Sequence, residues 1–465
     1  MEHLPVVIIG AGPAGLTAAY QLAQRNIRPI VVEKSNEVGG LARTENYKGY
    51  RFDIGGHRFF THLEQVEKLW QEVLGDEFVK VARLSRIYYD GRYFNYPLDV
   101  FNTLSNLGIV ESLLILFSYL KAKSRPYAEE KTFEHWVINR FGRRLYQKFF
   151  KAYTEKVWGI PCDAIQADWA AQRIQGLSLK TVVSNALFGN NYNHAKTLIH
   201  EFHYPLLGPG IMWQRFQDLI KGQGGLTYFN SEVARFNRSG HRIQEVCLRQ
   251  GQDIIGIQAK HFISTIPLTE LVFRLDPPAP DEVLEAARHL GYRSFVLVGL
   301  VINRRNLFPD QWVYIHDPEV KVGRIQNFGN WSAKMVPDSG KTSLGMEYFC
   351  TEGDDIWSMP DKKLVELAEK ELIHLGMVKA AEVEEGVVFR QPKAYPVYSS
   401  GYHLHLQVIR NFLSTVENLQ TIGRNGLHRY NNQDHSMLTG MLAAENILGA
   451  RHDLWKLGEG QQYLE

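Results

Sequence analysis

The chain has 465 residues, enough for two or three domains with full hydrophobic cores. With 52 Lys and Arg against 50 Asp and Glu, its formal charge is +2, which gives no support for nucleic acid or a membrane surface as the main partner. The three cysteines, Cys162, Cys247 and Cys350, are too far apart to indicate a disulfide framework or a metal cluster, so we expect a reducing cytoplasm and no metal site.

The N-terminus carries a dinucleotide-binding pattern. An apolar run at 6–9 predicts a buried strand, and Gly10, Gly12 and Gly15 begin the helix behind it. We expect Gly10 to permit a tight turn, Gly12 to let the backbone approach a pyrophosphate, and Gly15 to let helix and strand pack closely. Glu33 ends the next apolar run at the spacing that this unit requires, so its carboxylate is expected to accept hydrogen bonds from ribose hydroxyls.

Two further glycine pairs favour FAD over NAD. Gly39 and Gly40 follow Glu33, and F52-D-I-G-G-H57 comes about a dozen residues later. This extended pattern resembles the glutathione-reductase-like and amine-oxidase-like flavoproteins, which implies that Gly56 also lies at the cofactor. Most oxidases of that group read GGR at the first pair, whereas this chain reads G39-G-L-A42. Together with G55-G-H57, this departure resembles the UDP-galactopyranose mutases, particularly their eukaryotic branch.

The middle of the chain changes character twice. The segment 86–97 predicts a hairpin that turns at Asp90-Gly91, and a glycine-poor helical pattern follows from about 98 to 190. Within it, the apolar run 107–120 is interrupted by Glu111 and is too short to span a bilayer. We interpret this run as a buried or interface helix, with a membrane-surface element as the alternative.

Strand patterns return in the second half. The runs 261–266, 295–302 and 342–349 are consistent with an antiparallel sheet. The last part, 419–426 followed by 435–448, predicts a strand, a glycine turn and a helix, by which chains of this flavoprotein group return to the FAD domain.

We therefore expect an α/β protein that combines a Rossmann-type FAD-binding domain, a helical lobe and an antiparallel β-sheet substrate domain. The expected division assigns 1–97, 205–265 and 395–465 to a discontinuous FAD-binding domain, 98–204 to the helical lobe, and 266–394 to the substrate domain.

The resemblance to the mutases extends over nearly the whole chain as scattered motifs. F149-F-K-A-Y-T-E-K-V-W-G159 resembles the signature that brings a tryptophan, here Trp158, beside the nucleotide base. The segments 170–187 and 324–332 resemble those that supply two arginines to the diphosphate, which implies Arg173 and Arg324 here. Such a pair suits a diphosphate because Arg is a permanently charged bidentate donor. The alternative is that both are surface or ion-paired residues.

Other expected site residues have packing alternatives. His57 is expected at the flavin, or else as a hydrogen-bonded core residue. H428-R-Y-N-N-Q-D-H-S436 matches the C-terminal flavin motif of the mutases, which implies that Arg424, Asn432 and Gln433 bind FAD, with helix capping by Asp434 as the structural alternative. The aromatic residues expected at the substrate, among many that only pack, are Tyr96, Trp158, Tyr395 and Tyr430.

One motif departs from the mutase pattern. The mutases carry a glycine-rich F-x-x-P-x-x-G-G-x-G-x-x-W segment, which here is shortened to F202-H-Y-P-L-L-G-P-G-I-M-W213 with Pro209 inside it. Residues around 186–200 do not match the uracil pocket, so the sugar and the nucleotide are left open.

The resemblance implies a mutase-like flavoenzyme for a nucleotide-diphosphate sugar of the UDP-galactopyranose/furanose type, with no net redox change. Its FAD would be non-covalent and active in the reduced state as a nucleophile, with NAD(P)H as a possible reductant. The first alternative is an oxidoreductase like the amine oxidases or protoporphyrinogen oxidases. The second is a non-catalytic binding protein on the same fold. The sequence does not indicate an oligomeric state.

Overall fold

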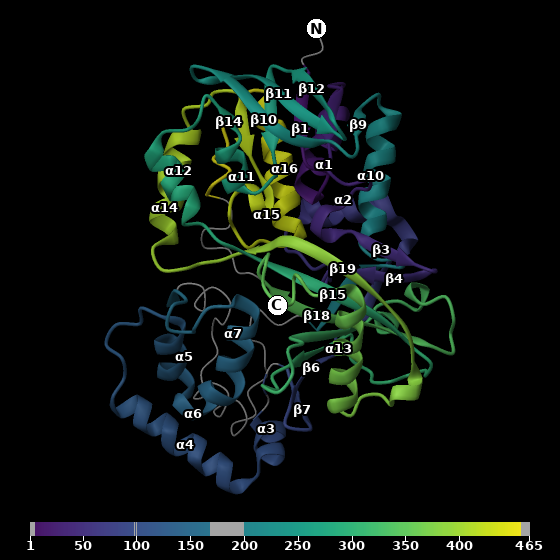
Figure 1. Cartoon of the computed structure of the whole chain (residues 1–465), viewed down its shortest axis with the longest axis vertical. Coiled ribbons are helices and arrows are strands. Elements are labelled where there is room, and N and C mark those ends of the chain that lie inside the picture. Colours follow the sequence, from purple (N-terminus) through teal and green to yellow (C-terminus); the bar gives the residue numbers. More distant parts are fainter. Residues whose placement is uncertain (1–4, 97, 99, 168–199, 457–465) are drawn as a thin grey trace.

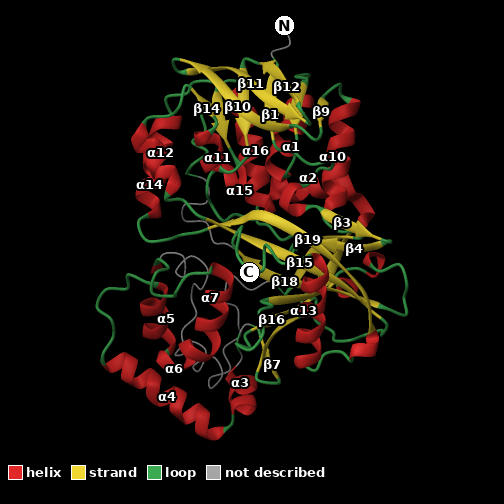
Figure 2. Cartoon of the chain, viewed as in Figure 1, coloured by secondary structure: helices red, strands yellow, loops and turns green. Residues whose placement is uncertain are grey.

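The computed structural model describes residues 5–96, 98, 100–167 and 200–456, so Arg173 lies outside the described residues. A half built around two sheets lies at the top of Figure 1, a larger sheet crosses the middle, and a lobe of helices lies below and to the left. Helices and strands are mixed throughout, as Figure 2 shows, which confirms the expected α/β class.

The nucleotide-binding half contains a parallel five-stranded sheet. Its central strand is the apolar run at the N-terminus, which pairs in parallel with a strand on either side and is fully buried. Strand 261–264, which we expected in an antiparallel sheet, instead pairs in parallel with this strand. The sheet order is β20 (Leu419–Thr421), β13 (His261–Ser264), β1 (Val6–Ile9), β2 (Pro29–Val32), β9 (Leu226–Tyr228).

Helices from both ends of the chain meet behind the glycine loop. The C-terminal strand and helix return to this half, as expected: β20 pairs with β13, and α16 packs on α1. Gly440 permits close packing, because a Cβ there would lie 2.3 Å from the Ala14 carbonyl oxygen. The helices of this half are α1 (Pro13–Ala23), α2 (Glu64–Leu74), α10 (Gly210–Gly222), α15 (Gly423–Gly426) and α16 (Gln433–Ile447).

A second sheet of four strands lies beside the first at the top of Figure 1. It has the order β12 (Asp253–Gln258), β11 (Arg242–Gln250), β10 (Glu232–Ser239), β14 (Leu275–Asp276). Its apolar face packs with side chains from three nearby helices, α11 (Leu268–Phe273), α12 (Asp281–Arg288) and α14 (Tyr402–Leu413).

The large central sheet has seven strands and is antiparallel except at one pair. The expected hairpin is confirmed, with Asp90 and Gly91 at positive φ in its turn. It joins this sheet through a parallel pairing of β6 with β16, so the hairpin, which we assigned to the FAD-binding domain, pairs with a strand of the expected substrate domain. The domain division therefore stays a proposal. The order is β19 (Val383–Pro396), β15 (Tyr292–Ile302), β18 (Thr342–Cys350), β17 (Arg324–Asn327), β16 (Trp312–Ile315), β6 (Ser85–Tyr89), β7 (Arg92–Asn95).

Smaller elements connect these parts. One helix, α13 (Asp361–His374), packs on the central sheet. Two short antiparallel pairs of strands form small sheets of their own. In one, β3 (Thr44–Tyr47) pairs with β4 (Tyr50–Asp53), and in the other, β5 (Phe78–Ala82) pairs with β8 (Glu201–Pro205).

The helical lobe forms as expected between 98 and 158, with a break at Gly142 and a π-helical turn at Tyr146–Lys151. Its helices are α3 (Val100–Leu107), α4 (Ile109–Ser124), α5 (Phe133–Phe141), α6 (Arg143–Leu145) and α7 (Ala152–Trp158). The apolar run 107–120 is helical from Ile109 onward, but seven of its large side chains are exposed. It is therefore not a buried helix, and the expected alternatives of an interface helix and a membrane-surface element stay open. Within the described residues, no helix has the length and hydropathy to cross a membrane.

Because α1 and α16 are in close contact at position 440, we expect any side chain there to destabilise the folded protein. Gly440→Ala is expected to lower the free energy of unfolding by about 1–3 kcal/mol, because the added methyl group overpacks against α1. Chemical denaturation of the protein checks this value. Gly222→Ala is the matched control, since a Cβ at the end of α10 meets nothing within 4 Å, and its stability should be unchanged or raised. Equal stabilities of the two variants would contradict the close contact.

Candidate active site

A single large cavity of about 910 Å³ collects most of the residues that the sequence singled out. It extends from the glycine loop behind β1, past the end of β19, to aromatic residues of the helical lobe. The expected site residues in its wall are Gly10, Gly12, Glu33, Gly40, Gly56, His57, Tyr96, Trp158, Arg324, Tyr395, Arg424, Tyr430, Asn432 and Gln433. Of the others, Gly15 and Gly39 lie behind this wall, and Arg173 is outside the described residues.

The glycine loop has the backbone that its spacing predicts. Gly10 adopts φ +100°, which other residues rarely do, and its N–H donates to the Val32 carbonyl (2.7 Å). Gly15 lets α1 begin directly against this turn, because a Cβ there would lie 2.0 Å from the Gly10 carbonyl oxygen. No side chain caps the first turn of α1, so its N–H groups face the cavity and can receive a phosphate.

Glu33 connects the loop to the strand that follows. Its buried carboxylate accepts hydrogen bonds from the Ala11 N–H (2.8 Å) and from the Ser35 N–H and hydroxyl (both 2.9 Å). The side chain therefore fixes the loop and also faces the cavity. This position is consistent with the expected contact to a ribose.

A second helix N-terminus lies in the opposite wall. Asn432 precedes the first residue of α16, and its side chain makes no capping hydrogen bond. The Asp434 carboxylate accepts a hydrogen bond from the His435 N–H in the first turn (2.8 Å), which agrees with the expected alternative of capping by Asp434. Gln433 carries a buried side-chain oxygen that has no hydrogen-bond partner among the described residues. Two helix starts whose N-cap residues make no side-chain cap, together with this oxygen, fit a dinucleotide with a polar ring at one end.

His57 lies in the wall between the glycine pairs and the arginines. Its Nε2 is 2.8 Å from the Ile54 carbonyl oxygen, as expected for a hydrogen-bonded core histidine. Burial lowers the pKa of His57 to about 4, and the charges of Arg424 and Arg324 act in the same direction. The imidazole is therefore neutral at pH 7, and its position in the cavity is also consistent with the expected flavin-side role.

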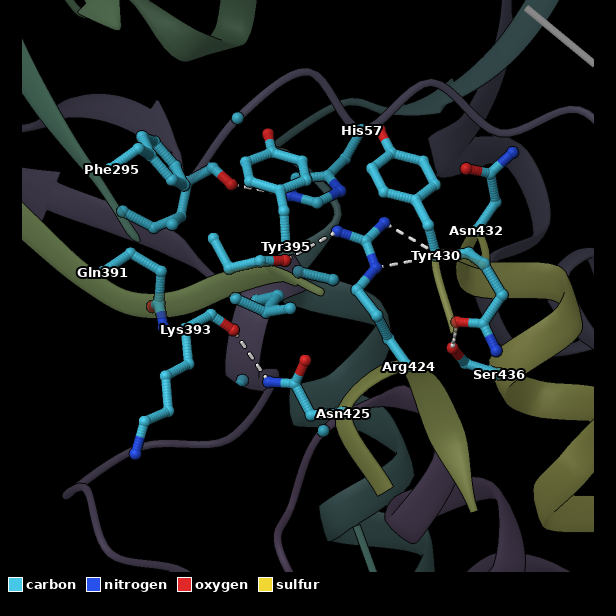
Figure 3. Close-up of a pocket in the computed structure, with 18 of the residues that line it drawn as sticks. His57, Phe295, Gln391, Lys393, Tyr395, Arg424, Asn425, Tyr430, Asn432 and Ser436 are labelled. Atoms are coloured by element: carbon cyan, nitrogen blue, oxygen red, sulfur yellow. Dashed lines mark hydrogen bonds between the residues drawn. The ribbon is translucent and has the colours of Figure 1, made fainter. Parts of the chain in front are cut away.

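Arg424 lies in the middle of Figure 3, beside the rings of Tyr395 and Tyr430. Its guanidinium donates to the Asn431 carbonyl (2.8 and 3.0 Å) and to the Ala394 carbonyl (3.2 Å). It lies 4.5 Å from the ring centroid of Tyr430 and 5.6 Å from that of Tyr395. Since no carboxylate of the described residues forms a salt bridge with it, this guanidinium leaves a positive charge in the cavity wall.

Three of the expected aromatic residues form one cluster. The rings of Tyr395 and Tyr430 stack at 5.5 Å with 13° between their planes, and Trp158 packs 6.5 and 6.3 Å from them. Burial raises the pKa of Tyr395, so its phenol keeps its proton. Tyr96 is separate from this cluster and packs against Tyr314 at 4.8 Å.

Arg324 is ion-paired, as its structural alternative predicted, but within the cavity wall. Its Nε and Nη2 donate to one oxygen of the fully buried Glu347 (2.8 and 2.5 Å), whose other oxygen accepts from Gln326 (2.9 Å). Burial opposes the charged form, yet Glu347 raises the pKa of Arg324 well above its usual value. Among the described residues, its Nη1 has no hydrogen-bond partner, so one face of a fixed cation is available to a ligand.

Some wall residues were not predicted. Lys393 lies at the end of β19, where its ammonium pairs with Glu270, and Figure 3 shows this side chain pointing away from the tyrosines. Four phenylalanines of the helical lobe also line the cavity. Nothing local in the sequence distinguishes them from core residues, and they are Phe133, Phe141, Phe149 and Phe150.

Comparison with known proteins identifies the class to which this fold and site belong. The family of flavin-containing amine oxidoreductases matches residues 13–447, and the chain belongs to this family. FAD is the cofactor that this membership implies, and the two helix starts and the glycine loop fit it.

The whole fold is also shared with particular flavoproteins. A crystal structure of reduced UDP-galactopyranose mutase superposes with a TM-score of 0.87 at 22% identity, covering 100% of this chain and 98% of that one. A protein of Exiguobacterium sp. 255-15, assigned as a protoporphyrinogen oxidase, gives 0.73 at 16% identity, covering 96% and 99%. By sequence, the "Probable UDP-galactopyranose mutase" of Klebsiella pneumoniae is 24% identical over 164 residues, 34% of this chain and 42% of that relative.

The position of Glu33 predicts a loss of cofactor affinity in Glu33→Ala. FAD binding is expected to weaken about tenfold to hundredfold, since a hydrogen bond to a charged group contributes ~1.5–3 kcal/mol. Fluorescence titration of FAD into the FAD-free protein measures the dissociation constant. Ser35→Ala is the control, because it removes one donor to Glu33 and keeps the carboxylate. An unchanged constant in Glu33→Ala would show that this carboxylate serves only the loop.

Proposed function

We propose that this protein is an FAD-dependent enzyme that interconverts the ring forms of a nucleotide-diphosphate sugar, of the UDP-galactopyranose/furanose type, without net redox change. FAD would be bound non-covalently, and in its reduced form it supplies the nucleophile for this chemistry. In this proposal, the glycine loop, Glu33, Arg424 and the start of α16 hold the cofactor. The aromatic cluster and Arg324 bind the substrate.

The observation that carries this proposal is the arrangement of Arg324. Glu347 holds two of its nitrogens in a fixed orientation, so a ligand meets a pre-oriented donor at Nη1. Arg424, with which no carboxylate of the described residues pairs, lies nearby, since its charge and that of Arg324 both act on His57 and Tyr395. A cavity with this charge attracts a diphosphate and repels a protonated amine. Within the family, the charges therefore favour an anionic substrate.

The other residues have roles that follow from their contacts. Arg324, together with Arg173 from the mutase-like motif, would stabilise the departing diphosphate. Trp158, Tyr395 and Tyr430 offer ring faces for the base or the sugar, and Tyr96 adds a phenol at the end of the hairpin. The neutral His57 would orient the cofactor without adding a charge.

A second candidate rests on a different observation. The four phenylalanines of the helical lobe give one part of the cavity an apolar wall. Such a wall suits an oxidoreductase that removes a hydride from an apolar substrate. This candidate differs from the first in requiring an electron acceptor at every turnover.

UDP is the probe that separates the two candidates. We expect UDP to bind the reduced enzyme and to bind Arg324→Ala or Arg173→Ala more weakly by about 2–5 kcal/mol, with a smaller dependence on salt, because a partly buried charged contact is lost. Arg324→Lys should restore only part of the affinity, because an ammonium lacks the bidentate fork. Calorimetry at two salt concentrations measures both effects.

Two controls keep the result interpretable. Arg324→Gln combined with Glu347→Gln removes both charges, so a loss of UDP binding with normal FAD content is then due to the guanidinium and not to a stranded carboxylate. Arg288→Ala, at an exposed pair with Glu285, should leave UDP binding unchanged. Absence of UDP binding to the wild-type enzyme at millimolar concentration would favour the oxidoreductase.

A further inference from the structure

The helical lobe presents an apolar helix face to solvent. Seven large apolar side chains of α4 are between 41% and 81% exposed. Three- and four-residue spacings place them along the outward side of the helix, whereas Ile115 and Ala122 on the inward side are buried. The exposed side chains are Ile109, Val110, Leu113, Leu114, Leu116, Phe117 and Leu120, which we call the α4 face.

Two polar side chains of α4, Glu111 and Ser118, face the helical lobe and fix this orientation. Glu111 accepts two hydrogen bonds from the Arg144 guanidinium (2.6 and 2.8 Å) and pairs with Lys148. Ser118 accepts a hydrogen bond from the Arg144 N–H (3.0 Å). Rotation of the helix to bury its leucines would break these bonds and leave the Arg144 guanidinium without its carboxylate partner. The helix is therefore held with its apolar side outward.

The α4 face is too large and continuous for an ordinary surface. Single exposed apolar residues are normal, but a patch of several hundred Å² on one element usually marks a binding surface. Seven such side chains, exposed over about half of their area, present on the order of 800 Å², which is the size of one side of a standard interface. In Figure 1, α4 forms the outer edge of the molecule, on the side away from the nucleotide-binding sheet.

The charge of the helical lobe distinguishes two partners that could cover the α4 face, a second copy of this chain and a lipid surface. Residues 98–158 contain ten Lys and Arg against six Asp and Glu, a net charge of +4, whereas the whole chain has +2. Exposed Lys121, Lys123 and Arg125 follow the α4 face at the end of the helix. If two copies paired through their α4 faces, two positively charged lobes would come together. Since α4 has no exposed carboxylate, nothing on this helix would offset the repulsion between them. An anionic lipid surface matches both the apolar side chains and the cations.

We propose that α4 docks the enzyme on an anionic phospholipid surface. The helix lies in the plane of the interface, with the α4 face among the acyl chains and the three cations at the phosphates. This binding is peripheral, and it is independent of the reaction proposed above.

Sedimentation of the FAD-loaded protein with vesicles tests this proposal. The wild-type protein should bind vesicles of phosphatidylcholine and phosphatidylglycerol, and bind vesicles of phosphatidylcholine alone much less. Phe117→Glu should weaken binding by about tenfold or more, because it removes the apolar ring and adds a negative charge. Leu404→Glu is the matched control at a 63% exposed position of α14, and its binding should be unchanged.

A second pair of variants tests the charges. Lys121→Glu combined with Lys123→Glu should weaken binding to the mixed vesicles, whereas Lys362→Glu combined with Lys363→Glu, exposed on α13, should not. FAD content and thermal unfolding verify that each variant is folded. The proposal is overturned if the wild-type protein ignores the mixed vesicles. It is also overturned if the wild-type protein is a dimer that does not bind vesicles and Phe117→Glu converts it to a monomer. In that case, a second copy of the chain covers the α4 face.

Discussion

The close packing of α16 on α1 is the contact on which the rest of the structure depends. This contact joins helices from the two ends of the chain, and the helices come this close because Gly440 has no side chain. It also places the N-terminal ends of both helices at one cavity. Helix N-termini stabilise phosphates and polar ring oxygens, so one contact between helices determines where a dinucleotide can lie. The central sheet and the helical lobe then enclose the other end of the cavity.

At that other end, two arginine guanidiniums lie in the cavity wall. The chain belongs to a flavin-containing family. In its cavity, a guanidinium fixed by Glu347 lies near tyrosine rings, as does Arg424, which forms no salt bridge within the described residues. The low dielectric of the cavity strengthens the effect of both cations on a bound substrate. A neutral His57 adds no further charge. The fold is shared with oxidases, and our proposal of a diphosphate substrate rests on these two guanidiniums.

The sequence predicts well whatever depends on local spacing. Gly10, Gly15 and Glu33 lie within one βαβ unit, so their positions follow from the unit itself. The pairing of Arg324 with Glu347 does not follow in this way, because the two residues lie opposite each other on neighbouring strands and only the sheet register brings them together. The sequence of α4 left a buried, an interface and a membrane-surface helix open, since an apolar run alone does not show which of its sides faces the protein. Tertiary contacts, such as that of Glu111 with Arg144, determine which side of the helix faces inward.

The claim that the cavity handles a nucleotide-diphosphate sugar without net redox change is tested most directly by product analysis under anaerobic conditions. The reduced enzyme is incubated with a panel of UDP-sugars, and the sugars and the redox state of the flavin are measured together. The account predicts that one UDP-sugar is converted to an isomer of the same mass over many turnovers while the flavin stays reduced. Recovery of every UDP-sugar unchanged, together with reduction of the oxidised enzyme by an apolar substrate or an amine, would contradict it.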